Sequence, residues 1–276
     1  MNSEPVSTLY RVSFNDFYDW SDRRSVTSRR LCEKAIKQLI KRYNLKGMDV
    51  LSIGPGGGHE EYWFGIKGGN RLTFFDIDEH GEIESELKKM ANLPHVDNTN
   101  KVIDYYIGDF TKCGLAISKK FDLLYLSGFT PNEVRRAHGP IRIIRRLLKF
   151  KIFRAINLFA IMREPFHNSM YKAFSMAKPN GLIIIQSYYG GIDVISRKSY
   201  VEAINRAFAK ANIILLDFFC FESEPGVQLI VGFAGGKKQA LEFYKNIVAS
   251  ITTFHGRAKL EGKIKHVYSL ISAAGR

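Results

Sequence analysis

The sequence predicts an α/β fold, a three-layer sandwich in which helices cover both faces of a mostly parallel, seven-stranded sheet. Short apolar runs alternate with helix-compatible segments along most of the chain, which is typical of parallel strands joined by helices. A glycine cluster follows the first apolar run, at the point where a strand would turn into a helix. Two apolar runs around a Pro-Gly turn come last, and they predict an antiparallel last strand.

The expected elements form a single domain over residues 1–276. Strands are expected at 49–53, 71–77, 102–107, 121–126, 182–187, 213–221 and 227–233, with a turn at 178–181. Helices are expected at 25–43, from 60, and at 79–91, 162–176 and 199–211. Three parts surround this framework: an N-terminal helical cap at about 1–45 with core-covering aromatic residues, a basic amphipathic insertion at about 131–164 and a basic helical extension at about 235–276.

The composition indicates a folded protein with an anionic partner. Hydrophobic residues make up 45% of the 276 residues, enough for a sizeable core. The 41 Lys and Arg residues exceed the 27 Asp and Glu residues and give a formal net charge of +14. Such a balance favours nucleic acid, anionic lipid or phosphorylated substrates as partners, without choosing among them.

The cysteine pattern fits a reducing compartment, and the hydropathy indicates neither a signal peptide nor a membrane-spanning helix. Cys32, Cys113 and Cys220 are scattered, so neither a disulfide framework nor a zinc site is suggested. Residues 1–13 contain no apolar signal core, and no apolar run reaches the roughly 18 residues of a membrane-spanning helix. We therefore expect a cytoplasmic protein, either free or attached to the periphery of a membrane.

The glycine cluster at residues 50–59, VLSIGPGGGH, predicts a ligand site. Glycine lets the backbone turn sharply and lets a ligand approach the main chain without meeting a Cβ atom. The helix that follows offers free N–H groups at its N-terminus. In a parallel sheet of this kind, ligands bind at the carboxyl ends of the strands.

The next three strands end in residues that suit a nucleoside. Asp76 ends the second strand, 18 residues after Gly58, where a carboxylate can accept hydrogen bonds from both ribose hydroxyls. Asp109 ends the third strand and can accept from an adenine amine, while the apolar Phe110 covers the ring. Ser127 and Gly128 follow the fourth strand, and these small residues leave room for a ligand there. A single strand-end aspartate is usually a turn former, but four such features in order are more specific.

With these features the sequence resembles the class I S-adenosylmethionine-dependent methyltransferases, whose fold is Rossmann-like, from about residue 25 to residue 233. The segment LSIGPGGG at 51–58 is similar to the family's first motif, a strand followed by Gly-x-Gly-x-Gly. The segment AKPNGL at 177–182 is similar to its Leu-Lys-Pro-Gly-Gly-x-Leu turn before the fifth strand. The closing strand pair resembles the family's reversed last strand.

The resemblance implies S-adenosylmethionine as the cofactor and assigns its contacts. The glycines would line the methionine side, Asp76 would hold the ribose, and Asp109 with Phe110 would bind the adenine. The implied cofactor-binding residues are Ser52, Gly54, Pro55, Gly56, Gly58, Asp76, Ile77, Asp109, Phe110, Ser127 and Gly128. Ser52 departs from the family pattern, which usually has an acid there to position the sulfonium or the amino group. A nicotinamide dehydrogenase fits less well, because its Gly-x-Gly-x-x-Gly would need glycine in place of His59.

Methyl transfer from a sulfonium is an in-line displacement, so the protein mainly supplies proximity and alignment. A base helps when the acceptor is an oxygen. His59 is a candidate base beside the loop, or a helix N-terminal residue that faces water. Glu133 is a candidate catalytic or substrate group after the fourth strand, or a helix-start carboxylate. Tyr188, after the fifth strand, would shape the acceptor pocket or cover the core. No metal-ligand spacing stands out.

The segment 134–163 carries nine Lys and Arg residues and no Asp or Glu. Residues 141–152 place apolar residues on one helical face and basic residues on the other. The segment is interpreted as a helix packed on the body, as an interfacial helix on anionic lipid, or as a nucleic-acid surface. Its apolar half is larger than phosphate binding requires, which favours lipid over nucleic acid.

The sequence therefore predicts a methyltransferase that acts on an oxygen of a small-molecule, glycan or lipid-linked acceptor at or near a membrane surface. One alternative is an RNA methyltransferase, which the net charge of +14 suggests. The other is a non-catalytic binding protein of the same fold, which Ser52 and the lack of a clear base suggest. The acceptor, its atom and the oligomeric state stay open.

Overall fold

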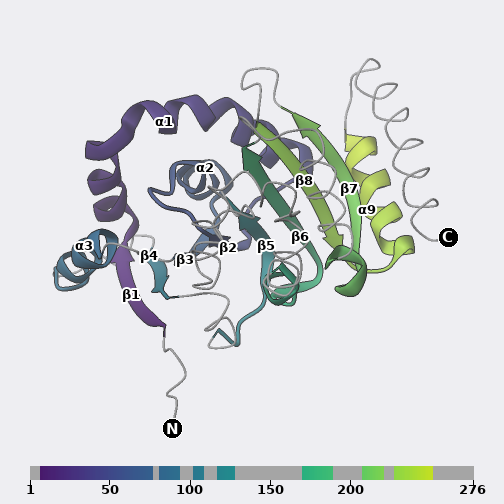
Figure 1. Cartoon of the computed structure of the whole chain (residues 1–276). Coiled ribbons are helices and arrows are strands. Elements are labelled where there is room, and N and C mark those ends of the chain that lie inside the picture. Colours follow the sequence, from purple (N-terminus) through teal and green to yellow (C-terminus); the bar gives the residue numbers. More distant parts are fainter. Residues whose placement is uncertain are drawn as a thin grey trace, which may run out of the picture.

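The computed structural model describes residues 7–76, 81–93, 102–108, 117–127, 170–188, 207–220 and 227–250 (Figure 1). Its strands are β1 (Thr8–Ser13), β2 (Asp49–Ile53), β3 (Arg71–Asp76), β4 (Val102–Ile107), β5 (Phe121–Leu126), β6 (Ala177–Tyr188), β7 (Ile213–Cys220) and β8 (Val227–Ala234). Its longer helices are α1 (Phe14–Tyr43), α2 (His59–Gly68), α3 (Glu82–Ala91) and α9 (Lys237–Ser250).

The strands form one eight-stranded sheet in the order β1-β4-β3-β2-β5-β6-β8-β7. Strands β4, β3, β2, β5 and β6 are parallel, whereas β8 runs antiparallel to both β6 and β7. The predicted fold class, with its reversed last strand, is confirmed. The chain leaves β2 first toward β3 and later returns to β5 on its other side, so the strand order reverses at β2.

The N-terminal part differs from the prediction. Helix α1 begins at Phe14 and not near residue 25, and β1 precedes it as an unpredicted edge strand, antiparallel to β4. Residues Phe14, Phe17, Tyr18 and Ser21 are all buried, and their spacing places them on one helical face. The aromatic residues of the cap were expected to cover the core, and they are part of it. Burial of this face stabilises the helix although aromatic residues have a weak helix propensity.

The predicted turn at 178–181 lies inside strand β6 as a bulge. Ala177 pairs with Phe121 before the bulge, and Leu182 pairs with Leu123 after it. Asn180 takes the left-handed conformation, with φ of +66°. The prediction of a turn that ends before the strand is therefore corrected: the strand begins at Ala177, and residues 178–181 form an irregularity within it, with pairing to β5 on both sides.

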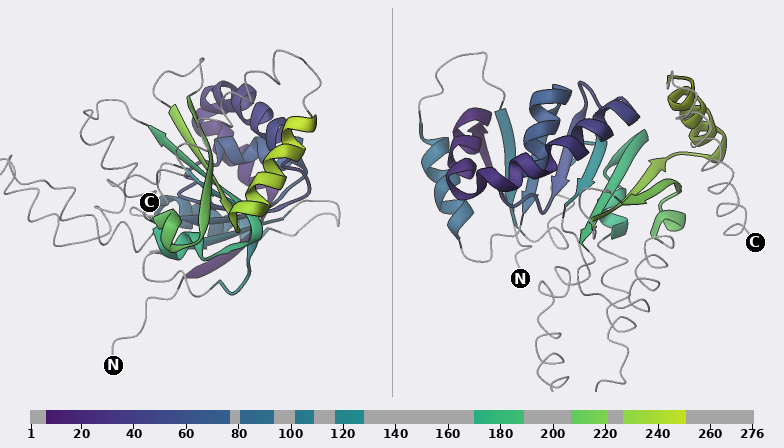
Figure 2. Two further views of the ribbon diagram at one scale, coloured as in Figure 1. Left: turned by 90° about the vertical axis from the view of Figure 1, so that its right-hand side faces the viewer. Right: turned by 90° about the horizontal axis from the view of Figure 1, so that it is seen from above.

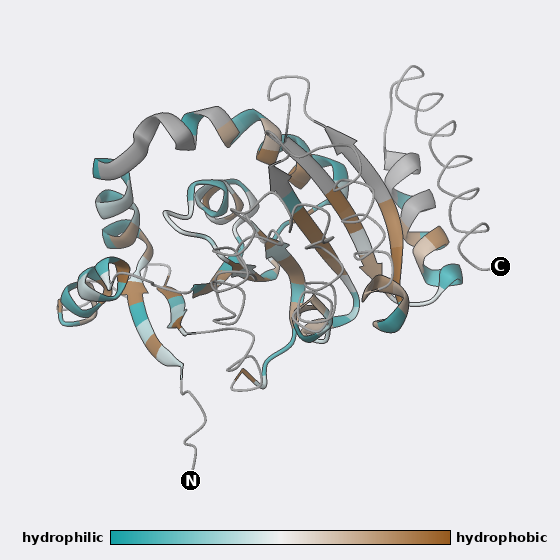
Figure 3. Cartoon of the chain, in the orientation of Figure 1, coloured by the Kyte–Doolittle hydropathy of each residue, from teal (hydrophilic) through white to brown (hydrophobic). Residues whose placement is uncertain are grey.

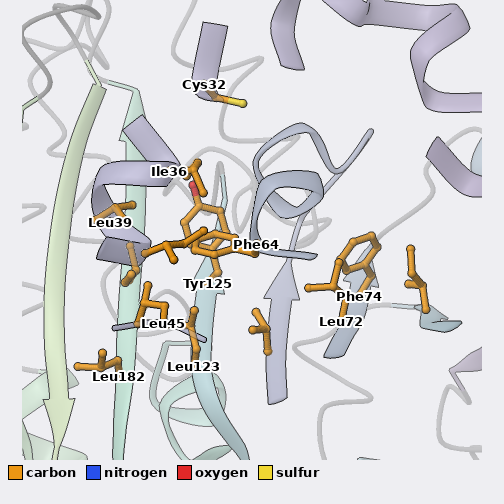
Figure 4. Close-up of a cluster of buried hydrophobic side chains, with 14 of the residues drawn as sticks. Cys32, Ile36, Leu39, Leu45, Phe64, Leu72, Phe74, Leu123, Tyr125 and Leu182 are labelled. Carbon is orange, nitrogen blue, oxygen red and sulfur yellow. The ribbon is translucent and has the colours of Figure 1, made fainter. Parts of the chain in front are cut away.

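Two hydrophobic clusters lie on the two faces of the sheet. One cluster packs α1, α2, α3 and α9 against the sheet, and the other packs residues 170–176 and 207–208 against the opposite face (Figure 2). The central strands are strongly apolar (Figure 3). Figure 4 shows the first cluster, in which Ile36 and Leu39 of α1 meet Phe64 of α2 above Tyr125 of β5. Alternate residues of each central strand thus enter opposite clusters, as a three-layer sandwich requires.

Several predictions lie largely outside the described residues. They are most of the helices at 162–176 and 199–211, the insertion at 131–164 and the extension beyond residue 250. Within the described ranges, no helix is long and apolar enough to cross a bilayer.

A charged network joins four segments at the amino edge of the sheet. The Asp49 carboxylate of β2 lies 2.6 Å from Arg71 Nε of β3, 3.1 Å from Lys119 Nζ and 3.3 Å from Lys178 Nζ of β6. Lys178 Nζ also lies 2.9 Å from Asp122 of β5. The hydrogen bond from Arg71, together with the two lysines, holds the pKa of Asp49 well below its usual range although burial opposes this. The charged form of Asp49 therefore stabilises the alignment of these strands.

We expect Asp49→Asn to lower the free energy of unfolding by roughly 1 kcal/mol at neutral pH. Because the folded-state pKa of Asp49 is lowered, its contribution is present above the unfolded-state value of about 4 and is lost as pH falls below it. Urea denaturation at neutral and at acidic pH measures the difference between variant and wild type, which should vanish in acid. Asp104→Asn, at the more exposed pair with Arg11, is the control and should have a smaller effect. An unchanged difference at low pH would contradict this role.

Candidate functional site

The glycine loop, residues 54–58, lies at the carboxyl end of β2, where the strand order reverses (Figure 1). Ligands of open α/β sheets bind at such a switch point, because the connections on either side of it diverge. The loop is therefore at the carboxyl end of a parallel strand, as predicted, and the sheet topology places it between the ends of β3 and β5.

The backbone of the loop requires glycine. Gly54, Gly56 and Gly58 have φ values of +74°, +54° and +64°. Gly54 N donates to Phe75 O of β3 at 2.9 Å, and a Cβ atom on Gly54 would lie 2.8 Å from Ser127 O. Ser127 in turn donates its N–H to Ile53 O at 3.2 Å. The structure thus brings Gly54 and Ser127, two of the predicted cofactor-binding residues, close together and fixes the loop to both neighbouring strands.

The first half of α1 forms a wall against this loop. Ser21 Oγ donates to Gly57 O at 2.6 Å, and a Cβ atom on Gly58 would lie 3.0 Å from Tyr18 Oη and 3.2 Å from Phe17. These residues precede the segment on which the resemblance rests, so the sequence predicted no part for them in the site. Their burial at helical spacing is the signal that could have indicated them.

Asp76 at the end of β3 also contacts the loop. Its Oδ2 atom accepts a hydrogen bond from Gly56 N at 2.9 Å and lies 3.4 Å from Tyr105 Oη of β4. Tyr105 Oη is also 3.4 Å from Gly56 O. The carboxylate predicted to hold a ribose is therefore beside the glycines, and Tyr105 is an additional contact that the sequence did not single out.

The first turn of α2 adds two acidic residues, Glu60 and Glu61, that were not among the predicted site residues. Glu61 is fully buried and accepts a hydrogen bond from Ser52 Oγ at 2.5 Å. Burial, with the negative charges of Glu60 and Asp76, raises the pKa of Glu61 to about 8, against the smaller opposite effect of the Ser52 hydrogen bond. The position of these acids depends on how α2 docks on the sheet, so only their place after a glycine loop was visible in the sequence.

Glu60 belongs to a second hydrogen-bonded group on the same face of the sheet. Gln186 Nε2 of β6 donates to Glu60 at 3.1 Å, and Tyr125 Oη of β5 donates to the Gln186 carbonyl oxygen. Ser52 is the direct neighbour of Tyr125 across the β2–β5 pair. Polar side chains of three adjacent strands therefore lie beneath the first turn of α2.

The other predicted residues are placed as follows. His59 begins α2 and folds back onto the loop, with its Nε2 atom 3.0 Å from a Cβ atom built on Gly57. Pro55 accepts a hydrogen bond from Gly58 N at 2.8 Å. Tyr188 ends β6, and the structure describes its backbone but not its side chain. Outside the described residues lie Ile77, Asp109, Phe110, Gly128 and Glu133. In the part of the chain that is described, no cluster of His, Cys, Asp and Glu could hold a metal ion.

We expect Gly54→Ala to destabilise the protein more than Gly69→Ala. Both glycines have positive φ, so alanine costs roughly 1 kcal/mol at either position. Only Gly54 has a backbone atom within 3 Å of the added Cβ, while Gly69 has nothing within 4 Å, so Gly54→Ala should cost about 2 kcal/mol more. Urea denaturation of the two variants measures this difference, and equal losses would contradict the close contact with Ser127.

Comparison with known proteins finds similar solved structures, all at low sequence identity. No protein-family model and no curated protein sequence matches the chain. The N-methyltransferase NodS from Bradyrhizobium japonicum WM9, solved with S-adenosyl-L-homocysteine, is 13% identical, with 79% of this chain and 98% of NodS covered and a TM-score of 0.45. An O-methyltransferase family protein from Burkholderia thailandensis is 9% identical over 79% of this chain, with a TM-score of 0.47. Human N-acetylserotonin methyltransferase, solved with S-adenosylmethionine, is 14% identical over 79% of this chain, with a TM-score of 0.41.

The chain spans 60% of the Burkholderia protein, 55% of the human protein and 48% of a similar Streptococcus mutans structure. These similar structures are methyltransferases by name, and their sequence identity to this chain is 9–14%.

Proposed function

We propose that the chain is a methyltransferase that binds S-adenosylmethionine at the glycine loop. The observation that carries this proposal is the charge around the loop. Three acidic side chains, those of Glu60, Glu61 and Asp76, gather there in a chain whose net charge is +14. A negative site in a basic protein attracts a cationic ligand.

The negative charge at the loop favours some of the ligands that bind to such a fold over others. Phosphate groups of a dinucleotide or a nucleoside triphosphate would be repelled by the carboxylates of Glu60 and Asp76. S-adenosylmethionine has no phosphate and carries a positive sulfonium and a positive ammonium group. A Cβ atom at Gly56 would meet nothing within 4 Å, so that part of the loop leaves space at the main chain for such a ligand. The residues of the site therefore fit the cofactor that the resemblance implies.

The residues of the chain have separate tasks in this proposal. When bound, the cofactor supplies a methyl group on a positively charged sulfur. Asp76 accepts hydrogen bonds from the ribose hydroxyls, while the glycine loop lines the methionine side. Asp109 and Phe110 bind the adenine, and Ser127 and Gly128 leave room at the end of β5. The main contribution of the protein is alignment of donor and acceptor, which by itself can lower a barrier by roughly 7–11 kcal/mol.

The acceptor is proposed to be an oxygen on a small molecule, a glycan or a lipid-linked molecule at a membrane surface. Support comes from the amphipathic pattern and the nine basic residues of 134–163, a segment outside the described residues. His59, Glu133 and Tyr188 are the candidates to remove the acceptor proton or to shape its pocket. Of these, only the side chain of His59 is described, and it lies beside the loop.

Calorimetry with S-adenosylhomocysteine tests the cofactor site. We expect binding with a dissociation constant below about 100 μM, and no binding of NADH or ATP. Asp76→Asn should weaken binding roughly tenfold, because it replaces a charge-assisted hydrogen bond by a neutral one. Asp104→Asn, at the edge of the sheet, is the control and should bind as wild type does. No binding up to about 1 mM would rule out the methyltransferase proposal.

Sedimentation with anionic vesicles and with RNA tests the acceptor surface. We expect the chain to sediment with vesicles of anionic phospholipid and not with neutral vesicles. A variant with Arg142, Arg145, Arg146 and Lys149 changed to Gln should lose this binding, at roughly 1 kcal/mol for each charge near the surface. Vesicle binding that is absent, or unchanged in the variant, would contradict the lipid surface. Binding to RNA that the variant loses would favour an RNA acceptor instead.

A further inference from the structure

The hydrogen bond between Ser52 and Glu61 joins the two ends of the glycine loop. Ser52 is in β2, two residues before the loop, and Glu61 is in the first turn of α2, three residues after it. Both side chains are fully buried, and Ser52 Oγ lies 2.5 Å from Glu61 Oε1. A carboxyl group is thus held beneath the loop on which the ligand is proposed to lie.

The second oxygen of this carboxyl group has no hydrogen-bond partner among the described residues. Glu61 Oε2 is buried and makes no hydrogen bond to any described residue. No cation forms an ion pair with Glu61 among the described residues, and its charged neighbours Glu60 and Asp76 are both acidic. A buried acceptor without a donor costs roughly 1–3 kcal/mol, and more if it is charged. A ligand that brings a positively charged donor would remove this cost.

The carboxyl group of Glu61 occupies the space that an acid at position 52 would use. In the rotamer that Ser52 adopts, the Cγ atom of Asp or Glu would take the place of Oγ, 2.5 Å from Glu61 Oε1, which is too close for a carbon–oxygen contact. An acidic side chain at 52 would therefore overlap with Glu61. Two carboxylates in one buried space cannot both be ionised at moderate cost. An acid at position 52 and Glu61 are thus alternatives, and the serine makes room for Glu61.

We propose that Glu61 supplies the carboxylate that the family pattern of the resemblance has at the position of Ser52, and that its Oε2 atom accepts a hydrogen bond from the α-ammonium group of the cofactor. Ser52 is then a positioning residue, which fixes the rotation of the carboxyl group through Oε1. This inference rests on the proposed cofactor and deepens it, because it assigns the amino-acid end of the ligand to a residue of α2.

Glu61 also couples ligand binding to protonation. It faces Ser52 from β2, Asp76 from β3 and Glu60 from its own helix, and burial with these acids raises its pKa to about 8. Without ligand the group is therefore mostly protonated at neutral pH. An ammonium group favours the ionised form, so the carboxyl proton leaves for the solvent as the ligand binds. Affinity should accordingly fall about tenfold for each pH unit below the pKa.

The test compares two ligands on two proteins by calorimetry. S-adenosylhomocysteine carries the α-ammonium group, and 5′-methylthioadenosine lacks the whole amino-acid end. We expect Glu61→Gln to weaken S-adenosylhomocysteine at least about tenfold at pH 8 and to leave 5′-methylthioadenosine unchanged. Glu60→Gln is the matched control one residue away and should have a smaller effect. Wild type should also release close to one proton at neutral pH, measured in buffers of different ionisation enthalpy, and Glu61→Gln should release none.

A second variant separates a binding role from a structural one. Glu61→Gln keeps the size of the side chain and the bond from Ser52, so its thermal unfolding should match or exceed that of wild type. The double variant Ser52→Asp with Glu61→Ala carries the carboxylate on residue 52 instead of residue 61, in the same buried space. We expect its preference for S-adenosylhomocysteine over 5′-methylthioadenosine to return in part.

The outcomes separate the inference from the function on which it rests. If wild type binds neither ligand, both fail. If wild type binds S-adenosylhomocysteine and Glu61→Gln binds it equally well, the inference alone is overturned. If Glu61→Gln weakens the binding of both ligands equally, Glu61 only shapes the loop, and the inference is also overturned.

Discussion

The close contact between Gly54 and Ser127 O is the constraint on which the site depends. It brings the ends of β2 and β5 together with no room for a side chain, and the hydrogen bond from Gly54 to β3 fixes the other side. The loop must then turn upward through residues with positive φ before α2 can begin. The direction of α2, and with it the location of its first-turn acids, follows from this contact.

Charge is arranged in opposite ways at the two edges of the sheet. At the amino edge, Asp49 and Asp122 lie among the cationic groups of Arg71, Lys119 and Lys178. At the carboxyl edge, Asp76, Glu60 and Glu61 lie near one another, and Glu61 has no cationic partner among the described residues. Pairing at one edge stabilises the fold. Accumulated negative charge at the other is unfavourable to the protein alone, and such an arrangement is typical of functional sites.

The N-terminal cap shows why part of the site could not be predicted. Helix α1 packs on α2, and Ser21 and Tyr18 contact the glycine loop from outside. Strand β1, which leads into α1, pairs with β4 about 90 residues later in the chain, as the register of Tyr10 with Tyr105 shows. A pairing over such a separation leaves no local signal, because a short alternating run is compatible with strand or loop. The aromatic residues therefore appeared only as a cover for the core.

The sequence by itself determined the succession of the central strands and helices along the chain, the glycine loop and the position of Asp76 at a strand end. These depend on local properties: apolar periodicity, the φ freedom of glycine, and the rule that parallel strands end at one edge. Only the tertiary structure decided that Glu61 lies against Ser52, that Tyr105 reaches Gly56, and that α1 covers the loop. Those contacts depend on how helices dock on the sheet, which the packing of many side chains determines together. For this reason the missing acid at position 52 could be seen in the sequence, whereas the acid beside it could not.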